Sequence, residues 1–225
     1  MVKYVFIDLD DTILDFKKAE NIAIKRTLSK LGIPVSEELC ACYSNINMLL
    51  WKSLERGEVT RDELRVIRFS RFFEKIGADV SAEVGARTYE GFLSEGHFFI
   101  DGAEQLIKEL SQIYDLYLAS NGITATQRGR IASADIKKYF KNIFISEDIG
   151  FSKPDKRYFD ACFNMIEGFE PEKAVIIGDS LTSDILGGKN AGIRTIWYAP
   201  HGNDDPLPDR TVLSLKDIPG VLKEL

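Results

Sequence analysis

The sequence predicts an α/β protein built on a doubly wound, parallel, five-stranded Rossmann-like sheet with an inserted α-helical module. From residue 97 onward, short apolar runs rich in β-branched and aromatic residues alternate with helical patterns, as parallel sheets require. Between a first strand at 4–7 and residue 97, only helical patterns occur. Because one strand–helix unit needs a single helix, this run indicates an insertion. We therefore expect an α/β core domain of residues 1–14 and 97–225 and a helical domain of residues 15–96.

The inserted segment is expected to form four helices. Apolar residues recur every three to four positions among charged ones, which is the period of an amphipathic helix. Gly32 with Pro34, then Gly57, then Gly77 interrupt the pattern, as helix ends commonly do. The predicted helices span 15–31, 37–56, 61–76 and 82–93.

The rest of the chain is expected to supply the other four strands and their helices. The predicted strands span 115–120, 142–146, 173–177 and 194–197. The predicted helices span 103–113, 124–134, 156–166, 182–191 and 215–225. A segment rich in Gly, Asp and Pro at 200–208 is predicted to be a surface loop, although its origin at a strand end leaves open that His201 lies near a ligand.

Composition excludes several classes of function. The 225 residues are 44% hydrophobic and 28% charged, which favours a folded domain over disorder. The net charge of −6 and the lack of a Lys/Arg run argue against nucleic-acid binding. No apolar run has the length of a membrane span, and no leader pattern is visible, so a cytoplasmic location is expected. The three cysteines, Cys40, Cys42 and Cys162, lack zinc spacing and are expected to be reduced.

The first strand ends in the acidic segment Asp8-Leu9-Asp10-Asp11-Thr12. In open α/β sheets, ligands bind at the carboxyl ends of the strands. The neighbouring carboxylates of Asp8 and Asp10 would repel each other unless a cation lay between them, and Mg²⁺ takes one or two carboxylates together with substrate phosphate. The alternative is a solvated turn in which Asp11 or Thr12 caps the next helix.

Three further predicted strand ends carry polar residues. Ser120-Asn121-Gly122 offers a hydroxyl and backbone N–H groups to an anion, although Asn-Gly is also an ordinary turn signal. Lys153 precedes a predicted helix and taken alone would be an exposed lysine. Gly178-Asp179-Ser180 places a carboxylate where a metal could bind. Asp184 follows within the first turn of the next helix, where an acid also favours the helix dipole.

Taken together, these segments resemble the four motifs of the haloacid dehalogenase-like (HAD) hydrolases. The matching residues are Asp8-x-Asp10-x-Thr12, Ser120, Lys153-Pro154 and Gly178-Asp179-Ser180 with Asp184. The resemblance covers the whole chain, and the helical insert corresponds to the cap domain of that family. Dehalogenases of the family need neither a metal nor an acid for the departing halide, so the presence of both Asp10 and Asp179 favours a phosphatase.

The resemblance implies a role for each residue. Asp8 would be the nucleophile that forms an aspartyl-phosphate, and Asp10 the general acid and base. Mg²⁺ would be held by Asp8, the backbone carbonyl of Asp10, and Asp179. Ser120 and Lys153 would bind phosphate, with Lys153 also offsetting the carboxylates. Thr12, Asn121 and Gly122 would also belong to the phosphate-binding residues, with Thr12 shaping the loop. Asp184 would orient Lys153 or a metal-bound water.

The substrate implied is a small-molecule phosphomonoester. The segments 47–51, 121–130 and 183–188 resemble the bacterial pyrimidine 5′-nucleotidase branch, which dephosphorylates nucleoside monophosphates. Trp51 could stack on a base, or it could face Phe69 or Phe72 in the helix core. Gln127 and Arg130 could serve only to hold their helix. A phosphoglycolate or sugar-phosphate phosphatase, a phosphomutase, and a binding module without turnover remain as alternatives; the sequence does not indicate an oligomeric state.

Overall fold

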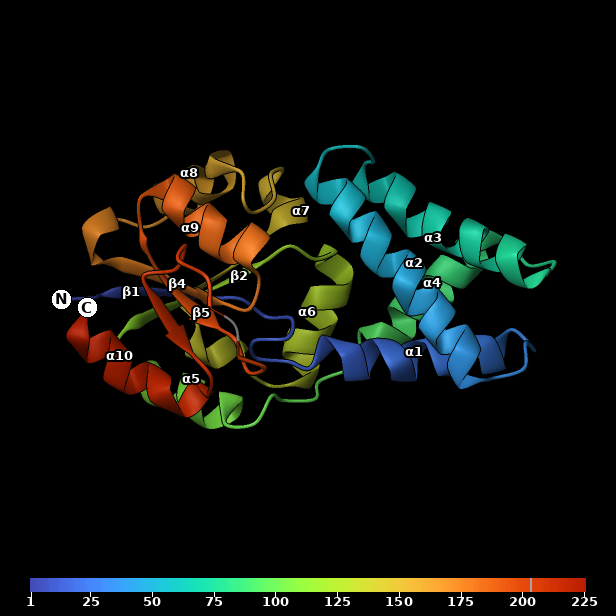
Figure 1. Cartoon of the computed structure of the whole chain (residues 1–225), viewed down its shortest axis with the longest axis horizontal. Helices are drawn as coiled ribbons and strands as arrows, with labels where there is room; N and C mark the ends of the chain where they lie inside the picture. Colours follow the sequence, from blue (N-terminus) through green and yellow to red (C-terminus); the bar gives the residue numbers. More distant parts are fainter. Residues whose placement is uncertain (203) are drawn as a thin grey trace.

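The computed structural model of the protein describes residues 1–202 and 204–225. Its centre is a six-stranded parallel sheet with the order β3-β2-β1-β4-β5-β6 (Figure 1). The strands are β1 (Tyr4–Ile7), β2 (Asp115–Ser120), β3 (Asn142–Ile145), β4 (Ala174–Gly178), β5 (Arg194–Tyr198) and β6 (Arg210–Val212). The predicted doubly wound parallel sheet is confirmed, but with six strands in place of five.

The first strand occupies the middle of the sheet. Ile7 pairs with Leu118 of β2 on one side and with Ile177 of β4 on the other. The strand order reverses direction here, because the chain continues outward from β1 first to β2 and β3 and later to β4, β5 and β6. Such a reversal opens a crevice at the carboxyl ends of the strands, which positions a ligand site beside the residues that follow β1.

Helices cover both faces of the sheet (Figure 1). Val5 and Ile7 face one layer, which includes Leu106 and Ile107 of α5 (Ala103–Leu110) and the closing helix α10 (Ile218–Glu224). Tyr4 and Phe6 face the other layer, formed by α8 (Lys156–Asn164) and α9 (Leu186–Ala191). Because successive side chains of a strand point to opposite faces, the uninterrupted apolar run of β1 buries both of its sides.

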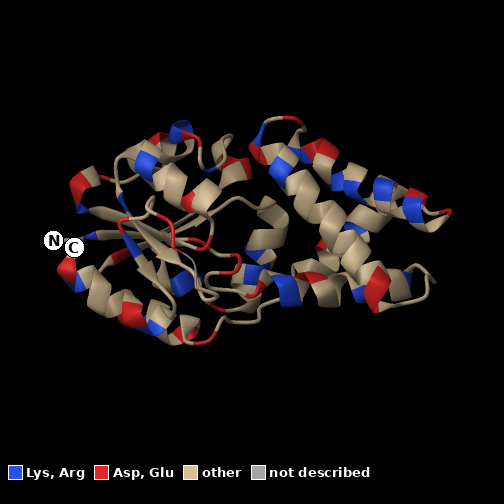
Figure 2. Ribbon diagram, in the orientation of Figure 1, with Lys and Arg blue, Asp and Glu red and all other residues tan. Residues whose placement is uncertain are grey.

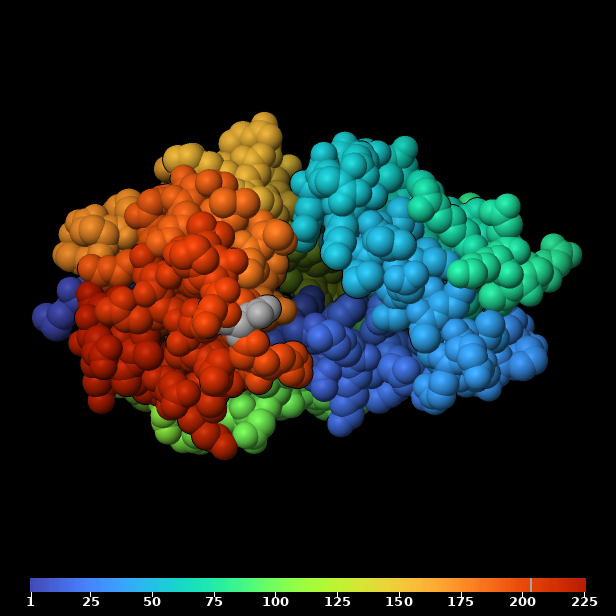
Figure 3. All heavy atoms as spheres, viewed as in Figure 1, coloured from blue at the N-terminus to red at the C-terminus, as the bar shows by residue number. Residues whose placement is uncertain are grey.

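Four helices at the other end of the molecule pack around a core of their own. They are α1 (Phe16–Lys30), α2 (Glu37–Glu55), α3 (Arg61–Ile76) and α4 (Ala82–Leu93). Their shared core is aromatic, with Tyr43, Phe69, Phe72 and Tyr89 fully buried. The space-filling view shows a hollow between these helices and the sheet (Figure 3).

Local sequence signals explain where these helices begin and end. Asp15, Ser36 and Thr60 accept hydrogen bonds from backbone N–H groups at the starts of α1, α2 and α3. Thr60 and Glu63 form a reciprocal capping box, which satisfies two otherwise unpaired donors. Gly77 ends α3 with φ 66°, a conformation that favours glycine. Predicted and observed helix bounds agree closely in this segment.

Three predictions about local structure are corrected. Residues 210–212 form β6 against β5, an edge strand too short to leave a periodic signal. Ser146 does not end β3 but begins the short helix α7 (Ser146–Ile149). The segment predicted as one helix at 182–191 starts with a π-helical turn, Leu181–Ile185, before α9. π-Helical turns are frequent at functional sites, and this one contains Asp184.

The remaining elements are short. They are α6 (Thr124–Ser133) and the 3₁₀ turns Lys137–Tyr139, Pro171–Lys173 and Leu215–Asp217. Of the helices in the described part of the chain, none is both long and apolar enough to cross a lipid bilayer. Cys40, Cys42 and Cys162 are all free thiols, as predicted. Residue 203, within the predicted 200–208 loop, lies outside the described residues.

Candidate active site

The acidic residues of the predicted motifs come together at the carboxyl ends of the central strands. Asp8 directly follows β1, and its backbone N–H donates to the carbonyl of Ile177 in β4 at 2.9 Å. Asp179 directly follows β4. Figure 2 shows acidic loop segments at this end of the sheet, where it faces the four helices α1–α4. The strand pairing therefore brings together carboxylates that are far apart in the sequence.

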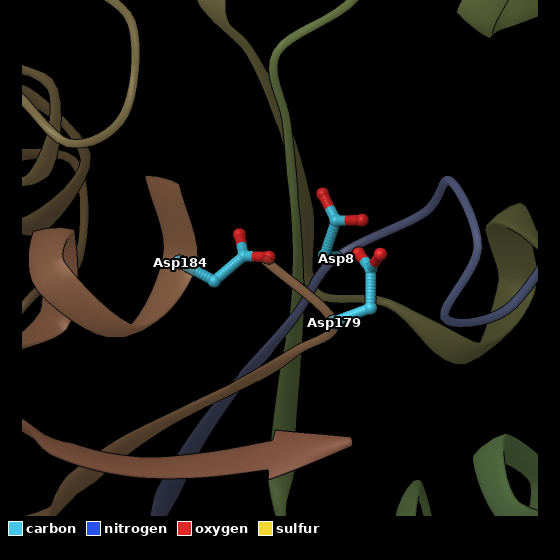
Figure 4. Close-up of side chains that lie close together, drawn as sticks. All are labelled: Asp8, Asp179 and Asp184. Carbon is cyan, nitrogen blue, oxygen red and sulfur yellow. The ribbon is translucent and has the colours of Figure 1, made fainter. Parts of the chain in front are cut away.

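Three carboxylates form a compact cluster. Oxygen atoms of Asp8, Asp179 and Asp184 all lie within 4.8 Å of one another, and the side chains converge (Figure 4). Burial raises the pKa of Asp8 well above its usual range, although Lys153 opposes this effect. Burial, and then repulsion from Asp184, raises the pKa of Asp179 to about 7. The protein alone thus leaves excess negative charge at this point.

Lys153 is the positive charge at the centre of the cluster. Its Nζ donates to Asp8 Oδ1, to Asp184 Oδ1 and to the carbonyl of Ala119, each at 2.6 Å. Burial alone would lower the pKa of Lys153, but the two carboxylates outweigh that effect and the pKa is raised. The lysine is 1% exposed, so the alternative of an ordinary surface lysine is excluded.

Asn121 holds Lys153 in place rather than presenting its amide to a ligand. Its Nδ2 donates to the Lys153 carbonyl at 2.8 Å, and its Oδ1 accepts from the Lys153 backbone N–H at 2.9 Å. Both ends of the amide are therefore used to join the loop after β2 to the loop that contains the lysine. This pairing orients the lysine side chain toward Asp8.

Both carboxylate oxygens of Asp184 accept hydrogen bonds within the protein. Oδ1 accepts from Lys153, and Oδ2 accepts from the backbone N–H of Ser180 at 3.1 Å. A side chain at Gly178 would overlap the carboxylate of Asp184, so glycine is required there for the close approach. Asp184 therefore supports Lys153 and the loop that carries Asp179.

The cluster suits a hard divalent cation. Its donors are carboxylate oxygens only, which Mg²⁺ and Ca²⁺ prefer over softer metals. One lysine balances two buried carboxylates and one partly buried carboxylate, so a cation would offset the burial and the mutual repulsion that raise the pKa of Asp8 and Asp179. The residues present fit such an ion.

The carboxylate of Asp10 points away from this cluster, toward α6. Gln127 Nε2 donates to Asp10 Oδ2 at 2.7 Å, and Arg130 Nη1 pairs with Asp10 Oδ1. Gln127 Nε2 also lies 2.7 Å from the hydroxyl of Ser120, at the end of β2. Gln127 and Arg130 thus contact motif residues and do more than hold their own helix.

The remaining motif residues are buried close to these groups. Thr12 is 1% exposed, and its hydroxyl makes no hydrogen bond within the described part of the chain. Ser120 is also 1% exposed, with its hydroxyl directed at Gln127. A side chain at Gly122 would overlap that of Gln127, so glycine there lets Gln127 reach both partners.

A cavity of about 420 Å³ separates the carboxylate cluster from the helices α1 and α2. Its floor includes Asp8, Asp10, Lys153 and Asp179. Its opposite wall consists of side chains from α1 and α2, namely Phe16, Lys17, Glu20, Ser44, Asn47, Met48, Trp51, Lys52 and Glu55. The cavity therefore joins the predicted catalytic residues to the inserted helices.

Trp51 lines this cavity and is half-buried. The rings paired with Phe69 and Phe72 are those of Tyr43, Phe73 and Tyr89, which form the core of the four helices. The geometry thus favours an indole facing the cavity over an indole packed into that core.

A group of three polar side chains, of which Glu20 and Asn47 are buried, lies on the same wall as Trp51. Asn47 Nδ2 and Ser44 Oγ donate to the two carboxylate oxygens of Glu20 at 2.7 and 2.6 Å. Burial raises the pKa of Glu20, against the opposing effect of these hydrogen bonds. The wall therefore offers an aromatic face together with polar groups.

The first helical turn of α3 touches the sheet domain beside the site. Arg61 Nη2 donates to Ser146 Oγ at 2.7 Å and to Ser152 Oγ at 2.9 Å. Ser152 immediately precedes Lys153, so this contact joins α3 to the loop that contains Lys153. Nothing in the sequence distinguished Arg61 from other helix-start arginines.

The loop after β5 also approaches the site. Pro200, His201 and Gly202 line a second cavity of about 190 Å³ together with Asp11 and Asp179. His201 itself is exposed, as expected for a surface loop. Trp197 of β5 supports the site more directly, because its indole N–H donates to the Asp179 carbonyl at 2.7 Å.

Comparisons with known proteins agree with this geometry. The haloacid dehalogenase-like hydrolase family profile matches residues 2–192. The pyrimidine 5′-nucleotidase PynA of Streptococcus pneumoniae is 40% identical over 220 residues, covering 96% of this chain and 93% of that protein. The pyrimidine 5′-nucleotidase YjjG of Escherichia coli is 27% identical over 225 residues, covering 97% of each chain.

A solved structure extends the comparison to three dimensions. The magnesium-bound crystal structure of YfnB from Bacillus subtilis, described as revealing interdomain movement, superposes with a TM-score of 0.92. It is 40% identical and covers 98% of both chains. The profile match, the relatives and the carboxylate–lysine geometry lead to one conclusion: the chain belongs to the haloacid dehalogenase-like hydrolases.

Proposed function

We propose that the protein is a Mg²⁺-dependent 5′-nucleotidase that hydrolyses pyrimidine nucleoside monophosphates through an aspartyl-phosphate. The observation that carries the proposal is the arrangement of Asp8, Lys153 and Asp179 on the floor of a cavity that also contains Asp10. This set combines a nucleophile, a cation, a metal ligand and an acid–base group within one enclosed space. Its substrate is a small-molecule phosphomonoester.

In the first step, an Asp8 oxygen attacks phosphorus while the bond from phosphorus to the leaving-group oxygen breaks. Asp10, in its protonated form, gives its proton to that oxygen, and the alcohol departs. Lys153 already holds one oxygen of Asp8, which orients the other for attack. The hydroxyl of Ser120 and the Lys153 ammonium are the proposed phosphate ligands.

In the second step, water attacks the phosphorus of the aspartyl-phosphate and releases inorganic phosphate. Asp10, now ionised, takes the proton of that water and so returns to its starting state. Asp8, Asp179 and the backbone carbonyl of Asp10 are the residues that would hold Mg²⁺, with Asp184 supporting them. When bound, the ion neutralises charge on the phosphate and on Asp8.

The substrate class is supported by the wall of the cavity. Trp51 offers an aromatic face, and stacking on such a face suits any nucleobase. Glu20 and Asn47 add hydrogen-bond acceptors and donors at the same wall. Two relatives that match nearly the whole chain carry the name pyrimidine 5′-nucleotidase, which supports the same class.

The four inserted helices are proposed to act as a cap. Residues 15–96 would form this domain, and residues 1–14 and 97–225 the catalytic core. The separate aromatic core of α1–α4 and the cavity between them and the sheet support this division. Three free thiols favour a reducing compartment, so we place the enzyme in the cytoplasm.

The test is phosphate release from a panel of esters, measured with Mg²⁺ and with EDTA. The panel contains dUMP, UMP, dTMP, AMP, phosphoglycolate and glucose phosphates. We expect Mg²⁺-dependent release that is fastest for the pyrimidine monophosphates. Trp51→Ala should raise KM for these substrates while leaving hydrolysis of p-nitrophenyl phosphate nearly unchanged.

Other outcomes separate the alternatives. Release that is fastest for phosphoglycolate or glucose phosphates would retain the chemistry and reject the nucleotide substrate. Isomerised sugar phosphate without free phosphate would identify a mutase. No turnover of any ester with Mg²⁺ would reject the enzyme assignment.

A further inference from the structure

We propose that Gln127 and Arg130 of α6 are positioning residues that hold the carboxylate of Asp10 at the leaving-group oxygen. The inference rests on the proposed phosphatase function, because Asp10 acts as acid and base only in that chemistry. It adds two residues to the site that none of the four motifs contains.

The first support is that the two side chains hold both oxygens of Asp10. Arg130 Nη1 pairs with Oδ1, and Gln127 Nε2 donates to Oδ2 at 2.7 Å. Residues three positions apart lie on the same face of a helix, so α6 presents both groups together. Each carboxylate oxygen has a second lone pair, which leaves room for the proton that Asp10 transfers. The carboxylate is thus fixed in rotation but free to react.

The second support is that Arg130 is itself immobilised. Its side chain is fully buried, and its Nε donates to the carbonyl of Gly96 at 3.0 Å. Its guanidinium lies 5.8 Å from the ring centre of Phe16. Gly96 follows α4 and Phe16 begins α1, so Arg130 contacts both chain segments that connect the inserted helices to the sheet.

The burial of Arg130 also argues for a role beyond stability. Removing a guanidinium from water costs several kcal/mol, and well-packed apolar residues at such positions are often equally stable or more stable. A charged residue at this position is therefore better explained by the orientation of its partner than by stability alone. That partner, Asp10, is about one-third exposed and lines the cavity.

The third support is the link through Gln127 to the proposed phosphate ligand. Gln127 Nε2 lies 2.7 Å from both Asp10 Oδ2 and Ser120 Oγ. Arg130 Nη1 in turn donates to Gln127 Oε1 at 3.3 Å, which orients the amide. The amide of Gln127 therefore positions Asp10, the proposed acid–base group, relative to Ser120, the proposed phosphate ligand.

The experiment compares two substrates whose leaving groups differ in their need for a proton. The alkoxide that leaves an alkyl phosphate such as dUMP needs protonation by Asp10, whereas p-nitrophenolate is stable without it. The ratio kcat/KM reports events up to the first irreversible step, the transfer of phosphorus to Asp8. A misplaced Asp10 should therefore affect only the alkyl substrate at that step.

We expect Arg130→Gln and Gln127→Leu each to lower kcat/KM for dUMP about 10- to 100-fold more than for p-nitrophenyl phosphate. Arg130→Lys should restore part of the loss by retaining one charged donor. The matched control is Arg128→Gln, which removes an exposed arginine of the same helix whose partner is Asp148. In this control, kcat/KM for both substrates should stay within about twofold of the unmodified enzyme.

The outcomes are separable. Equal loss on both substrates would assign Gln127 and Arg130 a structural role only and overturn the inference, as would unchanged activity in both variants. If Arg130→Gln lowers the melting temperature too far for assay, Gln127→Leu decides alone. If the unmodified enzyme cleaves neither substrate, the proposed function fails instead. If it cleaves alkyl phosphates other than dUMP, the fastest of these replaces dUMP in the comparison.

Discussion

At the scale of single residues, the site concentrates charge that the fold alone does not balance. Lys153 pairs with the buried carboxylates of Asp8 and Asp184, and Asp179 lies partly buried beside them. Burial raises the pKa of both Asp8 and Asp179. A cluster of this kind lowers the stability of the folded protein when no cation is bound, and a bound cation raises that stability. In the proposed mechanism, the charge arrangement that prepares Asp8 for phosphate chemistry would therefore also make the stability of the protein respond to bound Mg²⁺.

Asp10→Asn tests the acid–base assignment. The amide retains the shape of the side chain but cannot deliver or accept the proton, so kcat for dUMP should fall about 10²- to 10⁴-fold. Steady-state kinetics with Mg²⁺ measure the change, and the circular dichroism spectrum controls for folding. Near-normal turnover would remove Asp10 from the proposed mechanism.

The protonation of Asp179, a proposed metal ligand, should make both stability and metal binding depend on pH. The pKa of an aspartate in an unfolded chain is about 3.9, whereas burial, followed by repulsion from Asp184, raises the pKa of Asp179 to about 7. The folded protein therefore binds a proton that the unfolded chain has released. The contribution of Asp179 to the free energy of unfolding should thus fall as pH rises from about 4 to about 7 when no metal is bound.

Mg²⁺ competes with this proton for the carboxylate. We expect a saturating amount of Mg²⁺ to raise the melting temperature more at about pH 8, where Asp179 is ionised, than at about pH 5.5. Thermal denaturation with and without Mg²⁺ at both pH values measures the difference. An equal gain at both would show that Asp179 does not exchange its proton for the metal.

At the scale of elements, the carboxyl ends of the central strands and helix α6 position the side chains of the candidate site. The central position of β1 between β2 and β4 brings Asp8 beside Ser120 at the end of β2 and beside the loop that carries Asp179. Helix α6 then adds Gln127 and Arg130 behind Asp10. Each element contributes one or two groups, and the parallel sheet aligns them.

Much of this arrangement is visible in the sequence because each strand end has a local signal. An apolar run followed by carboxylates, by Ser-Asn-Gly or by Gly-Asp is recognisable without partners. The contacts of Gln127 with Asp10, of Arg130 with Asp10 and Gly96, and of Arg61 with Ser146 cannot be recognised in this way. They join residues from 34 to 120 positions apart, and helix periodicity does not report such distant pairing. Strand β6 is missed because three residues at an edge give no period.

Gly122→Ala tests how closely the loop after β2 packs against Gln127 of α6. A methyl group there would overlap Gln127 and displace it from Asp10 and Ser120, so kcat for dUMP should fall at least about 10-fold with a loss of roughly 1–3 kcal/mol in stability. The matched control is Gly91→Ala in α4, where the added carbon meets open space. The control should be neutral or slightly stabilising.

If Gly122→Ala instead behaves like Gly91→Ala in both kinetics and chemical denaturation, the packing of Gln127 against this loop is not needed for activity. The proposed link between the acid–base group and the phosphate loop would then lose its basis.

At the scale of the whole molecule, the inserted helices and the sheet share one cavity. The floor carries the proposed reacting groups, and the wall from α1 and α2 carries the groups proposed to select the leaving group. Arg61 joins the two parts at Ser146 and Ser152, while Gly96 and Phe16 belong to the chain connections. Substrate binding and the relative orientation of the two parts are therefore expected to be coupled.

Arg61→Ala should weaken this coupling. Loss of both serine contacts should raise KM for dUMP several-fold, because the orientation seen here would be less populated, with a smaller change in kcat. Arg71→Ala is the matched control, since Arg71 is an exposed arginine of the same helix. Equal KM values for the two variants would show that the Arg61 contact does not affect substrate binding.

The measurement that tests the central claim most directly is the mass of the peptide containing Asp8 after acid quenching during turnover. Asp10→Asn is the form to use, with Mg²⁺ and p-nitrophenyl phosphate, because its phosphorylation needs no acid while its hydrolysis lacks a base. The account predicts the added mass of one phosphoryl group on Asp8, and none in Asp8→Asn,Asp10→Asn. Phosphate release without any adduct, or an adduct on another residue, would contradict it.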